Sequence, residues 1–291
     1  VTVMKDGRVV GERTREDLSV SALVSMMIGA KVEEHYPKED NATDETLLSV
    51  DGVSTDNGVD RVSFTVRRGE VFGLAGLIGT GRTEIAQAVF GIDPLRNGKV
   101  HMRNGDVERT LKPDPGRAIK AGIALLTEDR KATGLFTNFS AVPNISIAKL
   151  RRILRRGLLD LGTEERFAGS FIDKLRITRS AVARSVRFLS GGNQQKVIIA
   201  RWMFSEAELF ILDEPTQGID VGAKVEVYHL INELTRAGKG VLLISSDFEE
   251  LLAMSDRIGI VNRGRIIDVR PSGDIDKQYL MERAFVHQLQ S

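Results

Sequence analysis

Two short motifs in the second half of the chain combine a receptor for phosphate with a pair of carboxylates. Residues 189–195 read LSGGNQQ, and residues 209–214 read LFILDE. The glycines of the first run predict a turn that opens a helix, where a serine and free helical N–H groups can receive an anion. The second run is an apolar strand that ends in Asp213 and Glu214, which can serve magnesium and a water molecule. The two motifs together predict a site for a magnesium-bound nucleotide.

A glycine-rich loop earlier in the chain adds a second phosphate receptor. Residues 76–84 read GLIGTGRTE and lie between an apolar strand and a helix, the context in which backbone N–H groups surround phosphate. Arg82 stands where such loops carry lysine, and its planar guanidinium fits poorly where a compact ammonium bridges the terminal phosphates. Glu84 either repels the nucleotide or compensates the helix dipole. We therefore expect a phosphate loop of reduced competence. The expected nucleotide contacts in it are Gly76, Gly79, Thr80, Gly81, Arg82, Thr83 and Glu84.

Bulk composition narrows the class of protein. Lys and Arg number 41 and Asp and Glu number 40, so no overall field favours nucleic acid or an anionic membrane. The 291-residue chain has no cysteine, which excludes disulfides and thiolate metal sites and fits a reducing cytosol. Its apolar runs are far too short to span a membrane, and no signal-peptide pattern opens it. A membrane role would need a partner subunit. Because the sequence starts at Val1 in mid-pattern, we expect a piece of a longer protein.

The order of expected elements indicates an α/β protein with a mostly parallel sheet. Apolar strands alternate with helical segments, and such units place helices on both faces of one sheet. Residues from about 138 to 190 are mostly helical and charged, which indicates a separate helical subdomain. The expected strands are 47–53, 62–66, 71–75, 99–102, 123–126, 209–212 and 240–244, and the expected helices are 83–90, 194–204, 223–237 and 248–254.

Two distant segments resemble each other. Residues 2–10 and 259–267 both read as apolar strand, basic-glycine turn and apolar strand, the pattern of a hairpin. The likeness is either chance or the trace of a tandem protein. On the tandem interpretation, residues 1–30, with a helix over 18–28, are the tail of a preceding module. Residues 31–46 are then a linker, and residues 47–291 form the second module.

The motifs resemble those of one family over about residues 47–270. The runs 79–84, 128–131, 189–196 and 213–220 are similar to those of the ATP-binding subunits of bacterial monosaccharide importers, of the ribose, galactose, arabinose and xylose type. These subunits are ABC (ATP-binding cassette) proteins. The arginine in place of lysine in the phosphate loop is similar to what their C-terminal module carries. The resemblance implies a P-loop NTPase fold of the ABC type. It has a mostly parallel sheet, an antiparallel β subdomain and a helical subdomain.

The resemblance also implies roles for individual residues. Two modules of such a subunit face each other head to tail, so Ser190, Gly191 and Gly192 would complete the ATP site of the preceding module. In the chain's own site, Thr83, Asp213 and Glu128 would serve Mg²⁺. Glu214 would act as general base, and Ser246 stands where a phosphate-sensing histidine is common. Asp220 lies in the intermodule loop or caps a helix.

The same resemblance implies the partners. They are the N-terminal module of the same polypeptide, membrane permease subunits and, indirectly, a periplasmic sugar-binding protein, with no nucleic acid. The subunit would lie at the cytoplasmic face of the cell membrane, as a peripheral protein. The cofactors would be ATP and Mg²⁺. Two alternatives stay open at this point: an ABC ATPase without a transport role, of the translation-factor type, and a pseudo-ATPase that only binds ATP as a scaffold.

Overall fold

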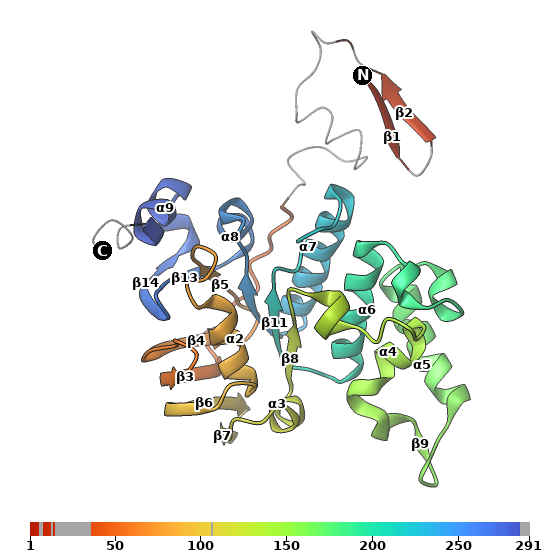
Figure 1. The fold of residues 1–291 in the computed structure, drawn as a ribbon, viewed down its shortest axis with the longest axis horizontal. Coiled ribbons are helices and arrows are strands. Elements are labelled where there is room, and N and C mark those ends of the chain that lie inside the picture. Colours follow the sequence, from red (N-terminus) through yellow and green to blue (C-terminus); the bar gives the residue numbers. More distant parts are fainter. Residues whose placement is uncertain (6–7, 13, 15–35, 106, 286–291) are drawn as a thin grey trace.

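The computed structural model describes residues 1–5, 8–12, 14, 36–105 and 107–285. Two sheets and a group of helices make up the main body (Figure 1). One sheet is largely parallel and lies at the centre, the other is antiparallel, and the helical group lies beside the central sheet. The predicted α/β class, with an antiparallel β part and a helical part, is confirmed.

The central sheet has six strands in the order β14-β13-β5-β12-β11-β8. All neighbouring pairs are parallel except β13 and β14, which form a hairpin. The innermost strands are continuous apolar runs and are buried along their whole length, as expected for strands covered on both faces. The strands are β5 (Val71–Ala75), β8 (Ile123–Leu126), β11 (Leu209–Asp213), β12 (Gly240–Ile244), β13 (Arg257–Asn262) and β14 (Arg265–Pro271).

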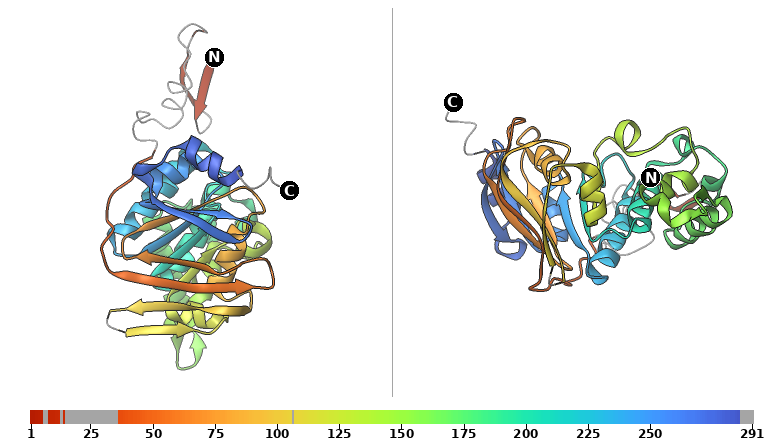
Figure 2. Two further views of the ribbon diagram at one scale, coloured as in Figure 1. Left: turned by 90° about the vertical axis from the view of Figure 1, so that its left-hand side faces the viewer. Right: turned by 90° about the horizontal axis from the view of Figure 1, so that it is seen from below.

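The second sheet is antiparallel and has the order β4-β3-β6-β7. Its strands are β3 (Thr46–Thr55), β4 (Val62–Arg67), β6 (Leu95–Asn104) and β7 (Val107–Leu111). Strand β4 alternates buried and less buried residues, the pattern of a sheet with one face on the core. Phe64 of this sheet stacks on Phe72 of β5 with ring centroids 5.2 Å apart, so the two sheets share one core (Figure 2, left).

The helices of the main body follow the strands that they connect. They are α2 (Arg82–Phe90), α3 (Pro115–Ala121), α6 (Gly191–Phe204), α7 (Val221–Arg236), α8 (Phe248–Met254) and α9 (Lys277–Phe285). Helices α2, α6, α7 and α8 agree with the sequence-based expectation within three residues at each end. Strand β7 was not expected, because residues 107–111 are exposed and carry little apolar periodicity. Helix α3 was not expected either, because only Ala118 of its residues is buried.

Helices and short 3₁₀ turns fill most of the region between β8 and α6 (Figures 1 and 2). Its main elements are α4 (Ala141–Ser146), a 3₁₀ segment over Ile147–Ile153 and α5 (Leu161–Lys174). A small hairpin of β9 (Leu154–Arg155) and β10 (Leu158–Leu159), not predicted, interrupts it. The buried guanidinium of Arg201 on α6 donates to the carbonyls of Asn144 and Gly134 at 2.7 Å each, which fastens α4 to α6.

The two hairpins expected from the internal likeness are present. Strands β1 (Thr2–Lys5) and β2 (Arg8–Glu12) pair antiparallel, as β13 and β14 do. The helix expected over 18–28 lies outside the described residues. Part of the expected linker, residues 36–45, lies along the main body. Lys38 forms an ion pair with Asp256 at 2.6 Å, and Asn41 donates to the Thr235 hydroxyl at 3.1 Å. The division into modules stays a prediction.

Candidate nucleotide site

The glycine-rich loop joins the end of β5 to the start of α2, as its sequence predicts. Gly79 and Gly81 have φ of 80° and 106°, values that glycine adopts readily. The Thr80 hydroxyl donates to the carbonyl of Leu77 at 2.7 Å and closes the turn. A cavity of about 260 Å³ opens at this loop. Its lining includes Gly79, Arg82, Thr83, Glu84, Glu128, Glu214 and Ser246, seven of the predicted site residues, together with Ile78 and Gln217.

The turn between β13 and β14 supports this loop from behind. Gly264 donates its N–H to the carbonyl of Thr80 at 2.7 Å, and its own carbonyl accepts from the N–H of Asp60 at 2.9 Å. A β-carbon on Gly264 would lie 1.7 Å from the carbonyl oxygen of Gly58, and Gly264 has φ of 74°. The contact therefore needs glycine.

We expect Gly264→Ala to lower the free energy of unfolding by about 3 kcal/mol, because it combines a left-handed alanine with a backbone clash. Gly238→Ala is the matched control, since Gly238 also has φ of 74° but nothing lies within 4 Å of its β-carbon position. The control is expected to lower the free energy of unfolding by only about 1 kcal/mol, which is the cost of the left-handed backbone conformation for alanine. Urea unfolding of both variants measures the difference. Equal costs would contradict the packing argument.

Arg82 does not point into open space at the phosphate loop. Its side chain is 8% exposed, and Nη1 donates to the carbonyl of Ser245 at 2.5 Å. Its Nη2 lies 3.5 Å from Oε1 of Glu214. The other carboxylate oxygen of Glu214 accepts from the Ser246 hydroxyl at 3.2 Å. Both oxygens of the expected general base thus face donors of the protein.

Asp213 and Thr83 form the part of the site that fits a metal. Burial raises the pKa of Asp213 to about 6, and the Thr83 hydroxyl partly offsets this. Oδ1 of Asp213 is buried and has no hydrogen-bond partner. An orphaned carboxylate oxygen beside a hydroxyl at a phosphate loop suits Mg²⁺, which takes one or two carboxylates and fills its shell with phosphate oxygens and water. Among the described residues, no group of three or more His, Cys, Asp or Glu side chains could hold a metal ion.

Glu128 lies at the rim of the same cavity but is bound to another side chain. Its Oε1 accepts from the amide of Gln217 at 3.3 Å. Arg130 in turn donates to the carbonyl of Gln217 at 2.7 Å, so the loop after β8 is connected to the loop after β11. The sequence places Gln217 and Arg130 in motif runs, but it gave no signal of this pairing.

The serine-diglycine turn lies elsewhere. Ser190 caps α6, and its hydroxyl accepts from the side-chain amide of Asn193 at 2.9 Å. Ser190, Gly191 and Gly192 are absent from the lining of the loop cavity. A β-carbon on Gly192 would lie 2.7 Å from Cβ of Ala223, so α6 and α7 begin in close contact. Asp220 caps α7 by accepting from the N–H of Ala223 at 3.0 Å, as one of its two predicted roles requires. The glycine-rich loop and the serine-diglycine turn, which the sequence predicts to receive phosphate, are thus separate in the chain.

A buried carboxyl group stands behind the site and was missed from the sequence. Glu250 on α8 has an exposed fraction of 0%, and burial raises its pKa. The hydroxyls of Ser245, Thr216 and Tyr228 partly offset this rise, yet neither carboxyl oxygen reaches hydrogen-bond geometry with a partner. In the sequence, Glu250 fits the polar side of a short surface helix, so its burial was not predicted.

The raised pKa of Glu250 predicts a pH effect on stability. The folded chain binds more protons than the unfolded chain from about pH 4.5 up to the raised pKa, so the free energy of unfolding falls as pH rises through that window. Glu250→Gln removes this term and is expected to stabilise the protein by about 1 kcal/mol at pH 7, with no gain below the ordinary glutamate pKa. Urea unfolding across this pH range tests it. The exposed neighbour Glu249→Gln is the control and should show no such trend. A destabilised Glu250→Gln at pH 7 would contradict the prediction.

Comparison with known proteins identifies the class. A family described as "ABC transporter" matches residues 59–217. Known structures with the same fold include a nucleotide-free ATP-binding cassette from an ABC transporter, with a TM-score of 0.68 and 20% identity over 82% of this chain and 98% of that one. Another is a dimeric cassette in a post-hydrolysis state bound to ADP and phosphate, with a TM-score of 0.66 and 17% identity over 78% of this chain and 99% of that one. The fold is that of an ATP-binding cassette.

Curated relatives define the family further. The ribose import ATP-binding protein RbsA 2 of Streptomyces coelicolor is 46% identical over 91% of this chain and 51% of its own length. RbsA 1 of Rubrobacter xylanophilus is 43% identical over 97% of this chain and 56% of its own length. A putative ribose/galactose/methyl galactoside import ATP-binding protein of Agrobacterium fabrum is 40% identical over 98% of this chain and 56% of its own length. The chain belongs to the ABC transporter family. It spans about half the length of these curated relatives.

Within the described residues, none of the helices is both long and apolar enough to cross a bilayer.

Proposed function

We propose that this chain is the second, degenerate nucleotide-binding module of the ATPase subunit of a monosaccharide importer. In this role it couples ATP binding and hydrolysis to sugar uptake from the cytoplasmic face of the membrane. Its partners are a preceding module of the same polypeptide and membrane permease subunits, with a periplasmic sugar-binding protein acting indirectly. The names of the curated relatives support the sugar-import class. The likeness of the β1–β2 and β13–β14 hairpins supports a tandem arrangement.

One observation carries the degenerate character of the module. The guanidinium of Arg82 is turned inward onto Ser245 and Glu214, and is nearly buried there. A phosphate-loop cation in this position neutralises the expected base instead of bridging the terminal phosphates. The turn formed by Ser190, Gly191 and Gly192, in contrast, leaves the Ser190 end of α6 exposed to solvent. We infer that its backbone N–H groups hold the terminal phosphate of an ATP bound to the preceding module.

The chemistry of the chain's own site follows from its side chains. Gly76, Gly79, Thr80 and Gly81 shape the loop that surrounds phosphate. Bound with the nucleotide, Mg²⁺ would be held by Thr83 and Asp213 and would supply charge neutralisation at the phosphates. Glu214 would accept the proton of the attacking water, but only after leaving Arg82 and Ser246. Glu84 lies at the start of α2 on the cavity wall, where its charge opposes that of the nucleotide.

ATPase measurements test the proposal. The chain alone should bind ATP and turn it over slowly. The same chain joined to the preceding module and assembled with the permease should belong to a complex that hydrolyses ATP faster in the presence of sugar and its binding protein. Fast turnover by the isolated chain would overturn the degenerate assignment. Tight ATP binding without any effect on a transport complex would favour a scaffold that only binds nucleotide.

A further inference from the structure

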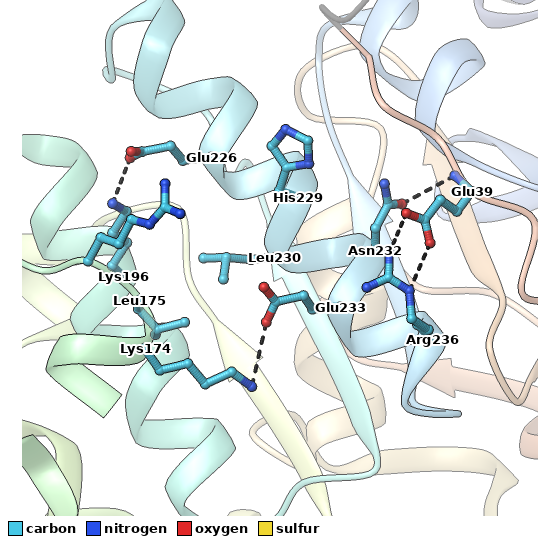
Figure 3. A pocket seen from close by; sticks show the side chains of 11 residues that line it. Glu39, Lys174, Leu175, Lys196, Glu226, His229, Leu230, Asn232, Glu233 and Arg236 are labelled. Carbon is cyan, nitrogen blue, oxygen red and sulfur yellow. Dashed lines mark hydrogen bonds and ion pairs between the residues drawn. The ribbon is translucent and has the colours of Figure 1, made fainter. Parts of the chain in front are cut away.

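A cavity separate from the one at the phosphate loop lies between α7 and the helical region that contains α5 (Figure 3). Its volume is about 380 Å³, and it shares no lining residue with the loop cavity. Helix α7 supplies one wall, and α6 together with the end of α5 supplies the other. This volume suits a small metabolite.

The charged groups of this cavity leave several donors unused. Glu226 pairs with Lys196 at 2.6 Å, Glu233 with Lys174 at 3.5 Å, and Glu39 with Arg236. Each carboxylate therefore has one cation already. Within the described part of the chain, the guanidinium of Arg176 makes no hydrogen bond or ion pair with another residue, although it carries five N–H donors.

Lys196 also lines this cavity, and its side chain is nearly buried. Its side chain is 6% exposed, and the structure gives its ammonium a single acidic partner, Glu226, which is half exposed. An ammonium has three donors, and a buried one is costly to leave with only one of them satisfied. Leu175 and Leu230 add apolar surface between the charged groups. His229 on α7 lies on the wall opposite Lys196 and adds a further nitrogen (Figure 3).

A guanidinium without a partner and a nearly buried ammonium with unused N–H donors, placed around a small space, are the chemistry that recognises phosphate. We propose that this cavity binds the phosphate group of a small metabolite through Arg176, Lys196 and His229. The bound anion would join α5 and α6 to α7. Helix α6 begins at the serine-diglycine turn, so occupancy of the cavity would stiffen the support of that turn. The binding itself does not depend on the proposed transport role.

Titration of the whole chain with inorganic phosphate and with glycerol 3-phosphate tests this site. The ring resonances of His229, assigned with a His229→Asn variant, report the cavity, and the amide resonances of Gly79 and Gly81 report the phosphate loop separately. We expect a saturable millimolar response of His229 to both probes, and none to chloride at equal ionic strength. The probe that binds more tightly distinguishes free phosphate from a phosphate monoester as the ligand.

Arg176→Gln is expected to weaken the His229 response about tenfold, as loss of a charged hydrogen bond does. Arg151→Gln is the matched control, because Arg151 is also an exposed arginine of the helical region but does not line the cavity. Thermal melting of both variants establishes that they fold. A response that does not saturate, or one that Arg176→Gln leaves unchanged, would overturn the proposal.

Discussion

Arg82→Lys is expected to raise the rate at which this chain hydrolyses ATP by about tenfold or more. In the structure, Nη2 of Arg82 lies 3.5 Å from Glu214, and the pair is buried. Lysine keeps the positive charge but lacks the planar fork that donates at once to the Ser245 carbonyl and faces the carboxylate. It would release Glu214 to act as base, and general base catalysis contributes about 10²–10⁴ in rate.

Two further variants separate this mechanism from a general loosening of the site. Arg82→Gln also releases Glu214 but removes the charge, so it should bind ATP less tightly and hydrolyse it no faster than the parent chain. Glu214→Gln in the Arg82→Lys background should return the rate to the parent level or below. Steady-state phosphate release measures all three. If Arg82→Lys left the rate unchanged, Arg82 would not be what restrains Glu214.

Ser190→Arg is expected to reduce the ATPase rate of the two-module subunit by about 10²–10³, the loss seen when one transition-state donor is removed. The large cation would cover the exposed N-terminus of α6, where the preceding module's nucleotide is proposed to lie. The chain's own phosphate loop should bind nucleotide as before, because Ser190 does not line that cavity.

Ser190→Ala distinguishes the loss of the turn from the loss of a helix cap. Alanine removes the hydroxyl that accepts from Asn193, which should cost about 1 kcal/mol of stability, but it keeps the backbone donors accessible. We expect Ser190→Ala to retain most of the ATPase rate. Normal turnover by Ser190→Arg would exclude the proposed role of the turn in the other module's site.

Much of the fold could be predicted from the sequence because its strands are apolar runs bounded by glycine and charged residues. Strands β5, β11 and β12 are buried along their whole length, so periodicity and length were enough to find them. The exposed strand β7 and the small β9–β10 hairpin form from local turn geometry and pairing with a neighbour, and their residues carry no comparable pattern.

The site was predictable in its parts but not in its connections. Motif spacing brought Arg82, Thr83, Glu128 and Glu214 to one cavity. It did not reveal that Arg82 turns toward Ser245, since the direction of a side chain depends on partners contributed by a distant strand end. The buried Glu250 was hidden for the same reason. Its burial results from α8 packing against the sheet beside Tyr228, a tertiary contact that composition does not encode.

The support that Gly264 gives to Thr80 has a consequence for affinity. The loop is already held by three hydrogen bonds at Thr80, one from the Gly264 N–H and two to the Leu77 carbonyl, before any ligand arrives. Such preorganisation spares an incoming triphosphate the entropy of ordering the loop. On the proposed role of Arg82, a cassette built in this way can lose turnover through one arginine and still retain its nucleotide, so loss of catalysis and loss of occupancy would be separable in evolution.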